Sequence, residues 1–203
     1  CKFSSVAWKH DKSGFWYNRF PGEGETGHEE QGTRSRVCWH KLGTPQAQDV
    51  IVYQDEKNVE LGFSPVASHD GKYLMLFVWH GTAPKNGIYY KTQDGKEDFV
   101  HLMENDLAMF NPIDNIGSTL YLHTDLEASK GRIIAIDLNN AARANWKEVI
   151  PQKSDVIDGV SLVNDQFVVT YSKDAHHNLM VFNLEGKLDH EIPLPTIGTV
   201  SGT

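Results

Sequence analysis

Apolar and polar residues alternate along short segments of the chain, and clusters of Gly, Pro, Asn and Asp separate these segments. A period of two is typical of strands that bury one face, because successive side chains of a strand point to opposite sides. No long stretch keeps the period of about 3.6 residues that marks an amphipathic helix. The pattern therefore predicts an all-β protein.

A segment that reads as strand, tight turn and strand recurs four times along the chain. The turn residues Gly14, Gly71, Gly117 and Asp165 mark equivalent positions in the four copies, so the repeating unit is about 50 residues long. A unit of this size with four short strands is typical of one blade of a β-propeller. The copies cover residues 8–17, 67–75, 113–121 and 162–168.

Turn residues divide each unit into four strands, so the sequence predicts about four four-stranded blades, at residues 1–55, 56–104, 105–152 and 153–198. Residues 199–200 are expected to open a fifth unit. The predicted strands are residues 3–8, 15–20, 35–42 and 49–53, then 63–67, 73–79, 87–91 and 98–102, then 109–114, 119–124, 132–137 and 147–150, and finally 158–163, 166–172, 178–183 and 189–192.

Composition excludes several classes of protein. Of the 203 residues, 39% are hydrophobic and 23% are charged, which is typical of a folded protein and not of a disordered one. The net charge of −8 argues against a nucleic-acid partner, because a negative surface repels phosphate. The longest apolar run, residues 73–79, is far shorter than the roughly 20 residues of a membrane-spanning helix. We therefore expect no nucleic-acid partner and no membrane partner.

The two ends of the chain and its cysteines give weaker indications. The chain begins without Met and without the pattern of a signal peptide, so we interpret it as cut from a longer protein. Cys1 and Cys38 are too few for a disulfide framework, which favours the reducing cytosol.

Motifs for catalysis are absent from the sequence. The nucleophile motif Gly-x-Ser-x-Gly does not occur, and the segment around Ser201 has the wrong spacing for it. The Gly-rich residues 22–27 lack the Lys of a phosphate-binding loop, and their Glu residues would repel a phosphate. We therefore expect no catalytic residue and no cofactor.

Histidines do not form a metal motif either. His28 lies beside Glu29 and Glu30 but lacks a second His four residues further on, as a helical zinc site would have. His176 and His177 are adjacent, so on a strand they would face opposite sides. We interpret this pair as turn residues before a strand that begins at residue 178, and we expect no metal site.

One long irregular segment, residues 21–34, stands where the other units have short connections. It is rich in Gly and Glu and nearly free of apolar side chains. Long loops of this kind are often functional or simply solvated. Two interpretations therefore stay open, a surface insertion and a gate over a binding site.

Several segments closely resemble the β-propeller of the prolyl oligopeptidase family, and they follow one another in order through the whole chain. The clearest are Lys-Phe-Ser-Ser-Val-Ala-Trp at 2–8, His-Asp at 10–11, Gly-Phe-Trp-Tyr-Asn-Arg-Phe-Pro at 14–21, His-Lys-Leu-Gly-Thr-Pro-Gln at 40–46, Ser-His-Asp-Gly-Lys-Tyr-Leu at 68–74, Trp-Lys-Glu-Val-Ile-Pro at 146–151 and Leu-Pro-Thr-Ile-Gly at 194–198. The related oligopeptidase B group shares the stretch at 40–45, whereas residues 79–86 are more similar to the prolyl enzymes.

This resemblance implies a serine peptidase in which a seven-bladed propeller caps an α/β-hydrolase domain and admits only short peptides. The catalytic serine, aspartate and histidine of the family lie in the hydrolase domain, which has no counterpart in these residues. The implied partners are therefore the protein's own α/β-hydrolase domain and short peptide substrates. The implied location is the cytoplasm, with the periplasm as the alternative.

The resemblance also implies which residues face the substrate. In the animal enzymes, the connection after the second strand of one blade brings an arginine and a cysteine to the substrate pocket, and the aligned positions here are Trp79 and Thr82. Trp79 is equally consistent with a core position. The segment 21–34 corresponds to a flexible family loop at the domain interface, and its candidate gating residues are Gly24, Gly27, His28 and Arg34.

Two classes of function follow. The first is the substrate-gating propeller segment of a serine-type prolyl oligopeptidase that hydrolyses short proline-containing peptides, inactive by itself because it lacks the triad. The second is a stand-alone propeller that binds a ligand or a partner protein. The propeller of an oligopeptidase B-like enzyme is a further alternative within the first class.

Overall fold

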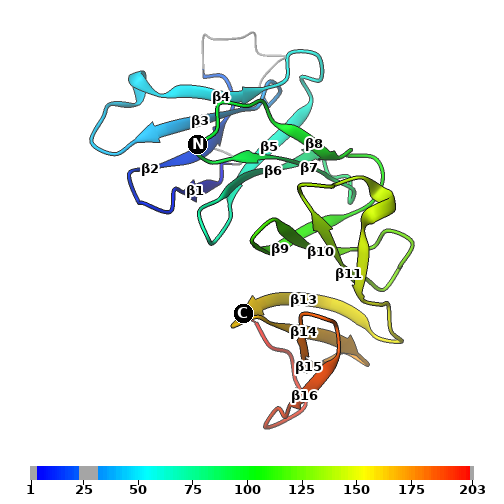
Figure 1. Ribbon diagram of the computed structural model, residues 1–203. Helices are drawn as coiled ribbons and strands as arrows, with labels where there is room; N and C mark the ends of the chain where they lie inside the picture. The colour runs from blue at the N-terminus through cyan, green and yellow to red at the C-terminus, as the bar shows by residue number, and fades with distance from the viewer. Residues whose placement is uncertain (1–3, 23–31, 202–203) are drawn as a thin grey trace. The chain divides into compact units, whose positions relative to one another are not determined.

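The computed structural model of the chain describes residues 4–22 and 32–201, and these residues form sixteen strands in four antiparallel sheets (Figure 1). Within each sheet the four strands pair in sequence order. Two short 3₁₀ segments, η2 (Gln46–Gln48) and η3 (Arg143–Asn145), lie between strands. The all-β prediction, which rested on the alternation of apolar and polar residues, is confirmed.

The chain divides into two compact units, Cys1–Ala108 and Met109–Thr203, and each unit contains two sheets. The first unit holds β1 (Val6–Trp8), β2 (Gly14–Arg19), β3 (Arg36–Lys41) and β4 (Val50–Gln54), and then β5 (Leu61–Ala67), β6 (Tyr73–His80), β7 (Gly87–Thr92) and β8 (Val100–Met103). The second unit holds β9 (Phe110–Ile116), β10 (Thr119–Thr124), β11 (Arg132–Asp137) and β12 (Lys147–Ile150), and then β13 (Val156–Val163), β14 (Gln166–Lys173), β15 (His176–Asn183) and β16 (Leu188–Ile192).

Each predicted strand corresponds to a strand of the structure, and β10, β11 and β12 have the predicted bounds. Two predictions at the end of the chain are wrong. His176 and His177 begin β15, because Asp174 and Ala175 form the preceding turn with positive φ values of 46° and 62°. Residues 199–200 form no strand. The turn is shorter than the sequence predicts, because Ala175 adopts a left-handed backbone conformation that is uncommon for a residue with a side chain.

Each unit has its own hydrophobic core. In the first unit, Leu74, Leu76 and Val78 alternate along β6 and point to one face of the sheet, where they pack in a buried cluster with Trp16 and Val37. In the second unit, the buried cluster includes Ile133, Phe167, Val169, Tyr171 and Phe182. Side chains on both faces of β6 are buried, as the continuous apolar run at residues 73–79 indicates, so this run rather than an alternation marks the strand as central.

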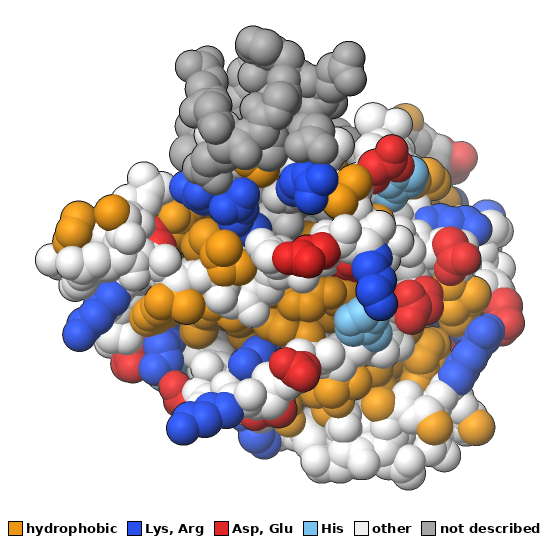
Figure 2. Space-filling model, turned by 90° about the horizontal axis from the view of Figure 1, so that it is seen from above, with side chains coloured by type: hydrophobic (Ala, Val, Ile, Leu, Met, Phe, Trp, Pro, Cys, Tyr) orange, Lys and Arg blue, Asp and Glu red, His pale blue; other side chains and the backbone are white. Residues whose placement is uncertain are grey.

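Some apolar side chains stay at the surface, among them Trp8 with 53% and Val50 with 61% of its area exposed. Figure 2 shows hydrophobic side chains in patches between charged ones on one face of the molecule. Within the described ranges, no helix is both long enough and apolar enough to cross a membrane.

Successive strands of each sheet in the first unit run in opposite directions, so their connections alternate between two ends of the sheet. We call one of them the turn end; it carries the β1–β2 and β5–β6 turns at residues 9–13 and 68–72, and the β3–β4 and β7–β8 connections. We call the other the rim; it carries residues 20–22 and 32–35 between β2 and β3, residues 55–60 between β4 and β5, residues 81–86 between β6 and β7, and residues 104–108 after β8. The candidate site residues lie at the rim.

Candidate functional site at the rim of the first unit

The predicted site residues that the structure describes lie at the rim. Trp79 is the next-to-last residue of β6 and is half-buried, whereas Thr82 follows in the β6–β7 connection and is exposed. Arg34 lies in the β2–β3 connection, is exposed, and has a positive φ of 59°. Gly24, Gly27 and His28 lie outside the described residues. The topology therefore brings Arg34, Trp79 and Thr82 to the same end of the sheets, although they come from two different connections.

Trp79 points to the face of its sheet opposite the buried cluster, because its neighbour Val78 belongs to that cluster. Its indole lies over Gly62, its partner in β5, where a Cβ atom would overlap the ring. The indole nitrogen donates to Ser64 Oγ at 3.4 Å, and the ring packs edge-on to Phe20 with centroids 6.4 Å apart. A glycine in the neighbouring strand thus makes room for an aromatic platform at the rim.

Asp55 shapes the connection between β4 and β5. Its Oδ1 accepts hydrogen bonds from the backbone N–H groups of Lys57 at 2.8 Å and Asn58 at 3.0 Å. Its Oδ2 accepts from the Asn58 amide at 2.9 Å. The carbonyl of Val59 accepts from the backbone N–H of Arg34 at 2.6 Å. The connection is therefore held in one conformation and is tied to the β2–β3 connection beside it.

The β6–β7 connection is fixed by its neighbours at the rim. His80 Nε2 lies 3.0 Å from Glu60 Oε2, and both side chains are exposed. Lys85 Nζ donates to the carbonyl of Asp106 at 2.7 Å. Asn86 is 2% exposed, and its backbone N–H donates to the carbonyl of Ala108 at 3.1 Å. These contacts join the three rim connections of the second sheet.

A cleft of about 510 Å³, which we call the rim cleft, opens between these connections. Tyr89 is its deepest residue, with 3% of its area exposed, and its ring stacks on His101 at 3.7 Å. Burial and, to a smaller extent, the nearby carboxylates of Glu104 and Asp55 together raise the pKa of Tyr89 to about 12. The cleft is lined by Lys57, Asn58, Val59, Glu60, Leu61, His80, Tyr89, Glu104 and Asn105.

Sequence reasoning missed the rim cleft. Tyr89 lies in β7 and belongs to the buried cluster of the first unit, and Glu60 and Glu104 come from connections far apart in the sequence. No local pattern joins residues that only the topology brings together. The one available signal was the resemblance, which pointed to the neighbouring residues Trp79 and Thr82.

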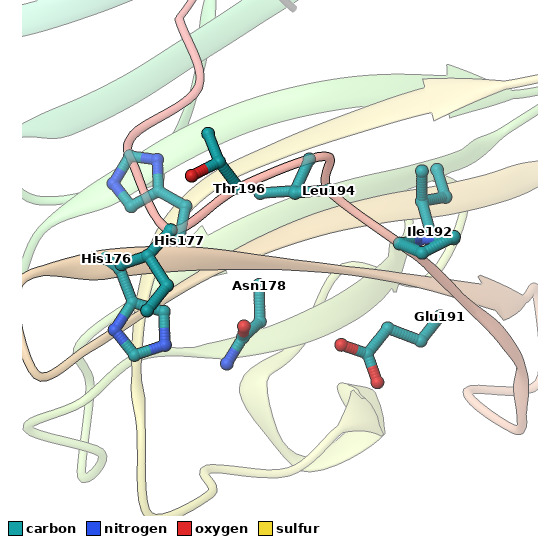
Figure 3. A pocket seen from close by; sticks show the side chains of 9 residues that line it. His176, His177, Asn178, Glu191, Ile192, Leu194 and Thr196 are labelled. Carbon is teal, nitrogen blue, oxygen red and sulfur yellow. The ribbon is translucent and has the colours of Figure 1, made fainter.

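A second cleft, of about 400 Å³, lies in the second unit between β15, the end of β16 and the residues that follow (Figure 3). His176 and His177 point to opposite sides of β15 there. His177 Nε2 lies 3.3 Å from Asp158 Oδ2, and its Nδ1 accepts a hydrogen bond from the backbone N–H of Val200 at 2.9 Å. Both ring nitrogens of His177 thus hold neighbouring chain segments in place.

The groups at the rim are suited to binding. They are aromatic faces, carboxylates and hydroxyls, carried by connections that rigid sheets hold in place. Across residues 4–22 and 32–201, no group of three or more His, Cys, Asp or Glu side chains could hold a metal ion.

Comparison with known proteins gives a consistent result. The whole chain, residues 1–203, matches the family described as "Prolyl oligopeptidase, N-terminal beta-propeller domain". The dual function macrocyclase-peptidase POPB of Galerina marginata is 32% identical over 196 residues, which cover 91% of this chain and 26% of that protein. The prolyl endopeptidase of Elizabethkingia miricola is 32% identical over 203 residues, which cover 99% of this chain and 28% of that protein.

Solved structures agree. A chain from a structural and mechanistic study of two prolyl endopeptidases matches with a TM-score of 0.88 and 29% identity, over 98% of this chain and 29% of that one. The apo prolyl oligopeptidase B of Galerina marginata matches with a TM-score of 0.86 and 28% identity, over 97% of this chain and 28% of that one. The chain therefore spans less than a third of the length of the relatives that it matches, and its four sheets are part of a propeller.

Proposed function

Because the chain belongs to the family of the prolyl oligopeptidase N-terminal β-propeller domain, we propose that it is the substrate-gating propeller segment of a serine-type prolyl oligopeptidase. The hydrolase domain of the parent protein carries out the cleavage of short proline-containing peptides. The chain itself binds and admits them. The match to prolyl endopeptidases along nearly the whole chain supports this assignment.

The observation that carries the gating role is the placement of the rim residues. Arg34 and Thr82 are exposed on separate connections, and Trp79 is half-buried near the end of β6, just before the connection that carries Thr82. In the family that the chain resembles, this end of the propeller is expected to face the active site, which supports the proposal. A peptide that passes the rim would meet an aromatic face at Trp79 and hydrogen-bonding groups on both connections, so side chains here control which peptides enter.

Activity of the parent protein tests the assignment. We expect the full-length protein to cleave proline-containing peptides, and we expect residues 1–203 alone to show no cleavage under the same conditions. Loss of activity on substitution of the serine in the hydrolase domain is the control. A full-length protein with no peptidase activity would instead favour a stand-alone binding propeller, and cleavage by residues 1–203 alone would contradict the assignment.

A further inference from the structure

We propose that His177 is a pH-sensitive switch that holds residues 193–201 on the β13–β16 sheet at neutral pH and releases them in acid. This inference concerns the second unit and does not depend on the proposed function. It follows from the contacts of the two ring nitrogens of His177, which respond in opposite ways to a proton.

Residues 193–201 depend on His177 for their attachment. The backbone N–H of His177 donates to the carbonyl of Gly198 at 2.9 Å, and its ring Nδ1 accepts from the backbone N–H of Val200 at 2.9 Å. In the part of the chain that the structure describes, no other hydrogen bond joins this segment to the rest of the protein. Apolar burial adds little, since Ile197 has 82% of its area exposed. Loss of either hydrogen bond should therefore loosen the segment.

Protonation of the ring removes one of these two hydrogen bonds. Because Nδ1 accepts from Val200, the N–H proton of the neutral ring is on Nε2, 3.3 Å from Asp158 Oδ2. In the protonated ring both nitrogens carry a hydrogen, so Nδ1 cannot accept and its N–H faces that of Val200. The Nε2–H keeps its carboxylate neighbour and gains the attraction of an ion pair. Acid therefore detaches Val200 while the ring stays beside β13.

Few ionisable side chains surround His177, so Asp158 is the charged group beside the ring. On this face of the sheet, β14 places Ser172 opposite His177, and β16 carries His190 further along the sheet. Residues 193–201 carry no ionisable side chain. The nearby ionisable side chains on the other face are those of Lys173, His176 and Glu191.

Release of the segment changes the cleft of about 400 Å³ in the second unit. His177 lines this cleft from β15, and Leu194, Thr196 and Ile197 line it from the segment (Figure 3). About 10% of the His177 side chain is exposed, so the ring can exchange protons with solvent. Histidine ordinarily changes its charge between about pH 5 and 8. We therefore expect the cleft to lose the wall formed by the segment in this range.

Hydrogen exchange of the full-length protein, followed by mass spectrometry at about pH 7.5 and about pH 5, tests the switch. After correction for the pH dependence of the chemical exchange rate, protection of residues 193–201 should fall by about three- to tenfold at the lower pH, the effect of one lost hydrogen bond. In His177→Asn, the amide oxygen takes the place of Nδ1 as acceptor and does not titrate, so protection should be nearly the same at both pH values. In His177→Phe, which has no acceptor, protection should be low at both.

His190→Asn is the matched control. His190 is an exposed histidine on β16 with its Nδ1 3.0 Å from Asp189 Oδ2, and among the described residues it forms no hydrogen bond with residues 193–201. This variant should keep the pH dependence of the unsubstituted protein, and loss of that dependence would overturn the proposal. Equal protection at both pH values in the unsubstituted protein, or an unchanged pH dependence in His177→Asn, would also overturn it. His177→Asn decides the outcome even if His177→Phe does not fold.

Discussion

The turn end and the rim belong to the same two sheets, yet they are built in opposite ways. At the turn end, the β1–β2 and β5–β6 turns are copies of each other. Asp11 and Asp70 each accept a hydrogen bond from the backbone N–H two residues on, at 2.9 Å in both turns. Lys12 and Gly71 hold the same position with φ values of 58° and 74°. At the rim, the β2–β3 and β6–β7 connections differ in length, and the contacts of residues 32–35 differ from those of residues 81–86.

This difference indicates which end of the sheets carries side chains that can serve a function. The copied turns satisfy the backbone in the same way twice, so their sequence is determined by structure. The rim connections differ from each other and carry the exposed polar groups and the aromatic platform of Trp79. Exposed pairs such as His80 and Glu60 contribute little to stability, so side chains at the rim are available for recognition.

We predict the largest loss of stability for a substitution at the tight contact between Gly62 and the indole of Trp79. The substitution Gly62→Ala places a methyl group where the indole of Trp79 lies, so the ring must move. We expect a loss of about 1–3 kcal/mol in the free energy of unfolding, together with a shift in tryptophan fluorescence. The control is Gly159→Ala, where the nearest atoms, on Thr170, lie 3.9 Å from the added carbon. If both variants unfold at the same urea concentration, the platform is not held as described.

At the turn end, a somewhat smaller loss is expected from Ser68→Ala. Ser68 is 5% exposed, and its Oγ accepts hydrogen bonds from the backbone N–H groups of Tyr73 at 2.8 Å and Lys72 at 3.1 Å. Removal of the hydroxyl leaves the Tyr73 N–H without this acceptor, which should cost about 1–2 kcal/mol. Thr82→Ala at the rim should change stability by less than about 0.5 kcal/mol. Urea denaturation compares the two, and a larger loss at Thr82 would reverse the contrast.

Acid should weaken the turn end, where hydrogen bonds hold two carboxylates in their charged form. Hydrogen bonds from Ser13 lower the pKa of Asp11 to about 2 from its ordinary 3.8, and hydrogen bonds from Thr92 lower the pKa of Glu97 to about 2 from 4.5. A carboxylate whose pKa is lowered in the folded state stabilises the fold at pH values above its ordinary pKa. This stabilisation is lost as the pH falls toward about 2. Amide hydrogen exchange should therefore accelerate in residues 9–13 and 92–97 as the pH falls toward about 2. Asp11→Asn with Glu97→Gln should abolish this dependence, and uniform acceleration along the chain would contradict it.

Base should act on the rim instead, with the smallest effect. The folded pKa of Tyr89 is raised to about 12, mainly by burial, from its ordinary 10.0. The stabilisation of the fold is then complete below about pH 10 and decreases as the pH rises toward about 12. Tyr89→Phe should make the unfolding free energy less sensitive to pH in this window. A variant that keeps the full alkaline dependence would show that Tyr89 does not titrate in the folded rim cleft.

The turn end was predictable from the sequence in considerable detail. The His-Asp pairs at 10–11 and 69–70 identified two equivalent turns, although Gly14 is not the counterpart of Gly71: Lys12 takes that place, because its backbone adopts the same left-handed conformation. Alternating or continuous apolar residues predicted the strands. Local chemistry determines both features, so a single sequence is enough to find them.

The rim was not predictable in the same way. Trp79 and Thr82 came from resemblance alone, and Tyr89, Glu60 and Glu104 gave no signal, because three connections separated in sequence form one cleft. The start of β15 was predicted two residues too late for a different reason, since Ala175 adopts a positive φ that residues with a side chain seldom have and thereby shortens the turn. Long-range topology, in the one case, and an unusual backbone conformation, in the other, are not encoded in local patterns.

The gating role of the rim is the central claim, and one comparison of variants tests it most directly. Thr82→Trp adds bulk to an exposed rim residue, and Lys96→Trp adds the same bulk to an exposed residue at the turn end. In the full-length protein, we predict that Thr82→Trp lowers kcat/KM for longer proline-containing peptides by about tenfold, or about 1.4 kcal/mol. It should leave a dipeptide-sized substrate nearly unchanged, and Lys96→Trp should affect neither. Equal effects of Thr82→Trp on both substrates, or equal effects of the two variants, would contradict the account.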